Sequence, residues 1–472
     1  MVRYSMSSIF RIWVVTAGML PIMAGAAEPV SEVTPQPTPT PAPEVFDLPT
    51  TIHRALAISP AIESAQSFQE YAEARLAEVK GAYILPETRV RVLGGVVPDI
   101  PPGSGPPSFP VVDGGISDLG PFIQVRIEAI QPLFTFGKLS SLKSAAQSGV
   151  EARKAGVLSV RNEVVYRVKT VYHALSYLFS LQQFLEELSQ RAAKARELVE
   201  DKLLHHSPDT TDIDLMRLDV FQAETDRRLI ELNSAVKLGL ASLAVLIEAP
   251  RDKPIDIQDH DLRFREFEIQ PEIQYMERAK SARPELRQLT ELVAARRALI
   301  KVQEADYFPM FYLGGFYKFA EAPGRQEIDN PYLSDDFNIN VGGGGLGLEQ
   351  KLSFHMTTAR RDQAKAEYQQ ALADQRQALQ GIELEIKRAI SNAVARRDSV
   401  KIALKGFKAG RSWVTATTLN FGVGFVPAKD LLEAFVAYSK VKVSFFDTIH
   451  EYDSAVAELS RAVGEEVTDL RY

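Results

Sequence analysis

The chain has 472 residues, a formal net charge of −7 and no cysteine. The absence of cysteine excludes a disulfide framework, thiolate metal sites, a cysteine nucleophile and a lipid-modified N-terminal cysteine. The mild acidity argues against a nucleic-acid partner, because such binders usually carry a basic face. Hydrophobic residues make up 45 % and charged residues 24 % of the chain, which is typical of globular proteins.

The N-terminus has the features of an export signal. Arg3 and Arg11 form a positively charged region before an uncharged stretch over residues 12–27. Ala24-Gly25-Ala26 offers the small-x-small pattern of a cleavage site. Residues 28–47 hold six prolines without apolar periodicity, which is typical of an extended, disordered tether. We therefore expect a signal peptide at 1–27, a tether at 28–47 and ordered structure from about Leu48.

Two long stretches without proline predict very long helices. Apolar residues between Val157 and Leu188 recur every three or four positions, the near-heptad spacing of coiled coils. At 1.5 Å per residue these helices would be ~105 Å and ~95 Å long, so coiled-coil packing is expected. They should cover about 138–206 and 356–419, each followed by a polar turn and a shorter helix, over about 212–248 and 428–463.

Two strand-like segments precede each long helix. Ile123, Val125 and Ile127 alternate with polar residues, which is the period-two pattern of a strand. The other expected strands include Val90 in the first half and Phe311 and Phe316 in the second. The four expected strands cover about 88–92, 122–129, 311–319 and 338–341. A helix over about 51–84 should precede the first strand.

The order of helix, strand, strand, long helix and helix occurs twice, which indicates an internal duplication. Pro86 and Pro309 are 223 residues apart, and Asp219 and Asp430 are 211 apart. The expected organisation is a first repeat at 48–248, a joining segment at 249–283, a second repeat at 284–463 and a tail at 464–472.

The strands are long enough for an outer-membrane barrel, although a soluble strand pair that buries one face has the same pattern. Four strands cannot close a membrane barrel, and open edges cannot face lipid. Several chains would therefore share one barrel, and three copies give twelve strands. Aromatic residues could form an interfacial girdle: Phe308, Phe311, Tyr312, Phe316, Tyr317 and Phe319.

Over about residues 48–463 this pattern resembles the TolC-like outer-membrane efflux proteins. The local features that carry the resemblance are Ser59-Pro60, Gln131-Pro132-Leu133-Phe134, Asp219-Val220-Phe221-Gln222-Ala223-Glu224, and Gly422-Val423-Gly424 followed by Asp430-Leu431-Leu432-Glu433-Ala434. The resemblance implies a mainly α-helical protein with membrane β-structure. It implies a homotrimer with a twelve-stranded barrel in the outer membrane of a Gram-negative-type bacterium and an α-helical tunnel in the periplasm. The partners would be outer-membrane lipid, a periplasmic adaptor and an inner-membrane pump.

The resemblance also indicates where the periplasmic tip lies. Its turns, at Gly422-Val423-Gly424 and at Ser207-Pro208, would be the adaptor-docking turns. The best-known members of the family carry a basic residue before the acid that follows this glycine pair, where this chain has Val426. Asp430 and Glu433 would face the pore, and in a trimer they would form two stacked rings of three carboxylates each, six in all. Asp219, the repeat counterpart of Asp430, is a weaker pore candidate, and acids in a first helical turn also complement the helix dipole.

The chain offers little support for an enzyme, a cofactor or a metal. Gly342, Gly344 and Gly347 satisfy G-x-G-x-x-G, but strand-like sequence follows them where a nucleotide fingerprint needs a helix. His205 and His206, with Asp209 and Asp212, are more typical of a solvated turn than of a metal site. The leading function is a passive export duct. The alternative is a periplasmic coiled-coil structural or adaptor protein without a membrane barrel, which would be water-soluble.

Overall fold

The computed structural model describes residues 43–98, 119–205, 210–250, 253–325 and 335–468. Residues 43–472 form one compact unit. The expected signal peptide, most of the expected tether, and Ser207 and Pro208 lie outside the described residues.

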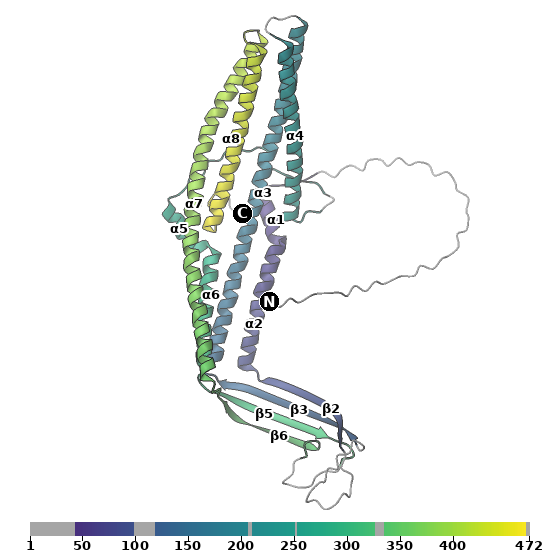
Figure 1. Cartoon of the computed structure of the whole chain (residues 1–472), viewed down its shortest axis with the longest axis vertical. Helices are drawn as coiled ribbons and strands as arrows, with labels where there is room; N and C mark the ends of the chain where they lie inside the picture. The colour runs from purple at the N-terminus through teal and green to yellow at the C-terminus, as the bar shows by residue number, and fades with distance from the viewer. Residues whose placement is uncertain (1–42, 99–118, 206–209, 251–252, 326–334, 469–472) are drawn as a thin grey trace, which may run out of the picture. The chain divides into compact units, whose positions relative to one another are not determined.

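The first half of the chain contains a short helix, a helix of 25 residues and one helical hairpin (Figure 1). The single helix expected over 51–84 is two helices, because Ser59 is extended and Pro60, which has no N–H, begins the second. The long helix and its partner begin at the expected residues and end two residues earlier than expected. The bounds are α1 (Leu48–Ile58), α2 (Pro60–Ile84), α3 (Lys138–Leu204) and α4 (Asp212–Leu246).

The second half repeats this order of helix, two strands, long helix and helix. The last helix has the bounds given by the sequence, and Pro427 is its N-cap. The joining segment holds a strand and a helix of its own. The bounds are α5 (Glu272–Ala282), α6 (Pro284–Ala305), α7 (Phe354–Gly422) and α8 (Ala428–Val463).

The four expected strands form one antiparallel sheet in the order β2-β3-β5-β6. Each is longer than its alternating sequence, and β6 includes the glycine run. Both outer strands of the sheet, β2 and β6, have an unpaired edge in the single chain. The bounds are β2 (Glu87–Pro98), β3 (Leu119–Phe134), β5 (Met310–Glu321) and β6 (Ile339–Glu349).

A second, parallel strand pair corrects the boundary expected near Leu48. β1 (Glu44–Phe46) pairs with β4 (Ile255–Ile257), so the last residues of the segment expected as a tether are ordered. Phe46 is buried in an apolar cluster with Ile52 and Ile257. Phe46 and the two isoleucines of β4 provide the burial that the proline-rich sequence before β1 lacks.

The helices bury their apolar stripes against one another in three separate clusters instead of one core. The near-heptad residues Val164, Val168 and Leu175 of α3 are buried, as the spacing predicts. α3 packs against α2, α4, α6 and α8, and α7 packs against α6 and α8. Figure 1 shows α3 and α7 each running from the sheet to a hairpin turn.

Candidate functional site

The two faces of the four-stranded sheet differ in chemistry. The ladder sets Val92 opposite Val125, and Val125 opposite Phe319, so these side chains share one face. This apolar face carries Val90, Val92, Ile123, Val125, Ile127, Phe311, Leu313, Tyr317, Phe319, Leu346 and Leu348. Of the strand residues expected in the barrel or its girdle, Tyr312 and Phe316 lie on the opposite face. An apolar outer face is what a membrane barrel requires.

The opposite face of the sheet, which we call the charged face, carries the polar side chains that alternate with the apolar ones along the strands. Arg91 of β2 lies opposite Arg126 of β3, and Arg126 lies opposite Lys318 of β5. We call these three residues the basic row. The next position along each strand on this face holds Arg89 and Glu128. The sequence predicted the alternation of β3, but only the register shows that three cations stand side by side.

Aromatic rings gather where the strands meet the helices. The Phe136 ring stacks on that of Phe308 with centroids 4.9 Å apart, and it lies 4.7 Å from Phe134 and 6.4 Å from Phe311. The sequence analysis named Phe308 and Phe311 as girdle residues but missed Phe134 and Phe136. A bulge after Pro132 moves Phe134 to the face of Phe311, which alternation alone does not predict.

The turn between α7 and α8 is tight and apolar. The Phe425 N–H donates to the Asn420 carbonyl at 2.9 Å, and Gly424 has a φ of +83°. A glycine adopts this left-handed conformation without strain, so the sequence needs one here. Gly422 is still helical, whereas Val423 and Phe425 are among the most exposed apolar residues described.

The acids named from the sequence differ in their surroundings. Asp430 and Glu433 lie in the first turns of α8, both exposed and without an ion-pair partner among the described residues. Asp219 of α4 accepts a hydrogen bond from Arg196 Nε at 2.7 Å. Arg196 also lies 2.6 Å from Glu200. The carboxylate of Asp219 is therefore neutralised by α3, unlike those of Asp430 and Glu433.

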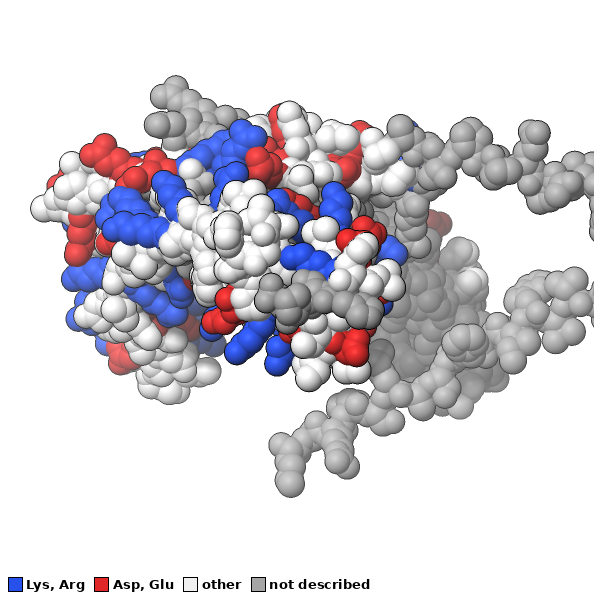
Figure 2. Space-filling view, turned by 90° about the horizontal axis from the view of Figure 1, so that it is seen from above, with Lys and Arg blue, Asp and Glu red and all other residues white. Residues whose placement is uncertain are grey.

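A link between the two hairpins escaped the sequence analysis. Lys202 Nζ, near the end of α3, donates to the Phe421 carbonyl near the end of α7 at 2.6 Å. The same ammonium lies 4.0 Å from the centroid of the buried Phe421 ring. The partners are 219 residues apart and form no motif, so no local pattern could have identified the pair. Figure 2, a view turned by 90°, shows side chains of both charge signs intermixed on the visible face.

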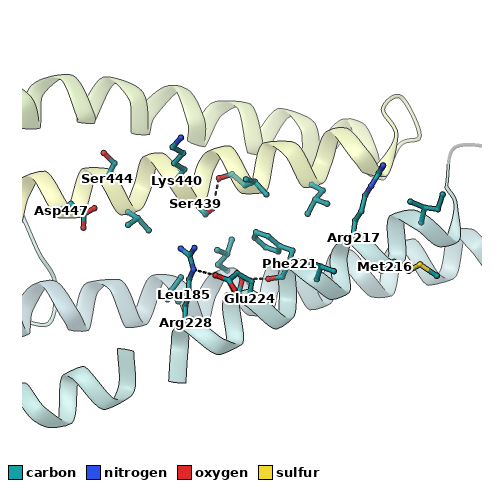
Figure 3. A pocket seen from close by; sticks show the side chains of 17 residues that line it. Leu185, Met216, Arg217, Phe221, Glu224, Arg228, Ser439, Lys440, Ser444 and Asp447 are labelled. Carbon is teal, nitrogen blue, oxygen red and sulfur yellow. Dashed lines mark hydrogen bonds and ion pairs between the residues drawn. The ribbon is translucent and has the colours of Figure 1, made fainter. Parts of the chain in front are cut away.

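An open groove of about 880 Å³ lies between α4 and α8, with Leu185 and Leu188 of α3 at its base (Figure 3). Its walls are mainly apolar, including Met216 and Phe221. Glu224 and Arg228, joined by a 2.8 Å ion pair, lie along one side. The same α4 is long and apolar enough, by composition, to cross a membrane, yet only 17 % of its most apolar window is buried. In one chain this helix therefore leaves a large apolar surface uncovered.

A second cavity, of about 800 Å³, lies between α3 and α8 beside residues 259–270. Burial raises the pKa of Asp453 to about 7, although the nearby Arg265 opposes this. Burial also lowers the pKa of His173 to about 4, and the charges of Lys169 and His450 add to the effect. Lys169 forms an ion pair with Glu466 at the same cavity. Within the described ranges, no group of three or more His, Asp or Glu side chains is placed to hold a metal ion.

Residues 275–465 match the family model of the outer membrane efflux proteins. This segment is therefore similar to an outer membrane efflux protein domain. No curated protein matches the chain. The match confirms the resemblance found in the sequence, and it covers α6, β5, β6, α7 and α8 completely.

Solved structures extend the likeness to the rest of the described fold. The outer-membrane channel OprN is similar with a TM-score of 0.71 and 17 % identity, over 88 % of this chain and 89 % of that one. The CmeC outer-membrane channel of Campylobacter jejuni is similar with a TM-score of 0.69 and 16 % identity, over 89 % of this chain and 87 % of that one. The open state of the MtrE outer-membrane channel of Neisseria gonorrhoeae is similar with a TM-score of 0.70 and 18 % identity, over 89 % of each chain. At these identities the likeness shows that this chain has the fold of outer-membrane channels.

Proposed function

We propose that this protein is the outer-membrane exit duct of a tripartite efflux or type I secretion system and conducts cargo passively to the exterior. The observation that carries the proposal is the amphipathic sheet joined directly to two long helical hairpins. One face of the sheet suits lipid and the other suits water. The efflux-protein domain and the likeness to outer-membrane channels support the same conclusion. We infer no catalytic function.

We propose that three copies assemble around one axis. The sheet has open edges at β2 and β6, and backbone groups at an open edge cannot face lipid. Three copies would supply twelve strands and pair every edge. Exposed apolar residues of α4, such as Ile230, Leu238 and Val245, would also gain partners in such an assembly. The repeated order of elements supports duplication of one ancestral half.

The barrel would lie in the outer membrane and the helices in the periplasm, after cleavage of the signal peptide near Ala26. Mass measurement of the detergent-extracted protein should give a trimer, and planar bilayers should show discrete channels. The mature N-terminus should lack Met1 and Arg3. A water-soluble monomer without heat-modifiable migration would contradict the proposal and indicate a periplasmic coiled-coil protein instead.

We propose that Asp430 and Glu433 form the cation-selective entrance at the tip. Their copies would crowd around the axis and attract polyvalent cations. The double variant Asp430→Ala/Glu433→Ala should lose cation selectivity and block by trivalent cations in single-channel recordings. Asp219→Ala should change both less, because Arg196 already neutralises that carboxylate. Equal effects of both variants would refute this placement of the entrance.

We propose that helices of a periplasmic adaptor bind the groove between α4 and α8 and contact the turn at Gly422–Gly424. The chain has no cysteine, so Val220→Cys places a unique thiol in the groove. This thiol should cross-link to a co-expressed adaptor. The control Ile402→Cys places a thiol on the exposed side of α7, away from the groove, and should cross-link less. Cross-linking only to a second copy of this chain would show a subunit interface instead.

A further inference from the structure

The basic row sets like charges directly opposite one another on three neighbouring strands. Arg91 pairs in register with Arg126, and Arg126 with Lys318. Like charges in this position destabilise a sheet, since directly opposed side chains are only about 5 Å apart at Cβ. Stability of the sheet therefore does not explain the row.

The three cations differ in how far acids neutralise them. Lys318 lies 2.8 Å from Asp336, and Arg126 lies 3.8 Å from Glu128. Arg91 is exposed and has no carboxylate within ion-pair distance among the described residues. Arg89, on the same strand and face, differs because it lies 2.8 Å from Glu87. Arg91 is thus the member of the row with an uncommitted guanidinium.

The strand that would adjoin Arg91 in a closed barrel offers no nearby acid. In the proposed trimer, β2 of one chain pairs with β6 of the next. On its charged face β6 carries Ile339, Val341, Gly343, Gly345 and Gly347, and Glu349 follows only at the end that joins α7. The Phe316 ring lies against Gly343, where an added Cβ would come within 3.1 Å of it. The wall beside Arg91 would therefore be smooth and uncharged.

We propose that Arg91, supported by Arg126 and Lys318, forms a position on the inner wall of the barrel that binds organic anions bearing phosphate or carboxylate groups. A guanidinium binds such groups through two parallel hydrogen bonds. This inference rests on the proposed function, because it takes the charged face as the inner wall.

The position would act across the whole pore only at low salt. Twelve strands about 4.8 Å apart and tilted by about 40° enclose a barrel of radius about 12 Å. The Debye length is about 10 Å at 0.1 M salt and about 3 Å at 1 M. The basic rows of three chains should therefore attract anions at 0.1 M and have little reach at 1 M.

The test compares Arg91→Gln with the matched control Arg89→Gln, which removes the same charge from the same strand and face. Inorganic tripolyphosphate is added to the barrel side of single channels in 0.1 M salt. The wild-type channel should be blocked, and Arg91→Gln should weaken the block at least about tenfold, since one charge-assisted hydrogen bond contributes about that factor. Arg89→Gln should change the block by less than about threefold.

Equal weakening by both variants would show that only net wall charge matters, and an unchanged block in Arg91→Gln would also overturn the inference. Calorimetric titration of tripolyphosphate into the detergent-solubilised protein gives a readout that needs no conduction. Binding that depends on Arg91 without any channel would refute the proposed function but keep the anion position. Channels without such binding would refute the anion position alone.

Discussion

Replacing Asp453 with asparagine should stabilise the protein at alkaline pH. Asp453 lies in the cavity between α3 and α8, and no hydrogen bond or ion pair to it is found among the described residues. Burial raises its pKa from 3.8 to about 7, with Arg265 opposing the rise. Above pH 7 the folded protein must hold a poorly solvated carboxylate, whereas asparagine carries no charge.

The magnitude follows from the difference between the two pKa values. At about 1.4 kcal/mol for each tenfold change in proton affinity, the buried charge costs about 4 kcal/mol per chain when fully ionised. Because the folded state binds the proton more tightly, the free energy of unfolding falls as pH rises from about 4 to about 7. About 1 kcal/mol of this fall should occur between pH 6.5 and 8.5.

His173 acts in the opposite direction at lower pH. Its pKa is lowered to about 4, chiefly by burial, so the unfolded state binds a proton first as pH drops below about 6.5. Stability therefore falls with acid through His173 and with alkali through Asp453. The pKa of His450 is lowered by burial as well, so both histidines still act near pH 6.5. Because the wild type and the variant share these histidines, the difference between the two proteins isolates the effect of Asp453.

The assay is thermal unfolding of the detergent-solubilised protein, followed by helical circular dichroism at a fixed scan rate. The midpoint of Asp453→Asn should increase relative to that of the wild type from pH 6.5 to 8.5, and it should be the higher of the two at pH 8.5. Asp398→Asn, an exposed acid of α7, is the control and should follow the wild type. A variant that is less stable than the wild type at pH 8.5, or that keeps its pH slope, would refute the reasoning.

Two further substitutions have matched controls one or two residues earlier in the chain. Glu466→Gln removes the carboxylate paired with the buried Lys169 and should lower the free energy of unfolding by about 3 kcal/mol. Glu465→Gln, at an exposed ion pair, should change it by less than about 1 kcal/mol. Similar losses for both variants in urea or thermal unfolding would contradict this difference. Gly424→Val should cost about 1–2 kcal/mol because of the left-handed backbone, while Gly422→Ala, in helix α7, should be neutral or slightly stabilising by the same measurement.

The sequence predicted the helices well because their signals are local. Apolar spacing and proline placement defined α8 to the residue and α3 to within two. The break at Pro60 was missed because both sides of it have helical periodicity, and only the missing N–H separates α1 from α2. Strand ends were less predictable, since β6 continues through glycines that have no side-chain pattern and are held by ladder hydrogen bonds to β5.

For the candidate site, too, local signals were predictable from the sequence and contacts between distant segments were not. Alternation placed Ile123, Val125 and Ile127 on one face, as the ladder confirms. Alternation within one strand does not fix how strands align, so it could not show that Arg91, Arg126 and Lys318 form a row. The proposed roles of Asp430 and Glu433 depend on other copies of the chain, and a single chain places them only on an exposed helix start.

The turn between α7 and α8 receives a cation from the other hairpin. Val426 stands where the best-known relatives of the resembling family carry a basic residue, but Lys202 brings a cation to the same turn from the other hairpin. An ammonium at the C-terminal end of α7 is favoured by the helix dipole as well as by the Phe421 carbonyl and ring. Separating the two hairpins would break this charged hydrogen bond, which contributes about 1.5–3 kcal/mol. This bond therefore joins the ends of the two hairpins within one chain.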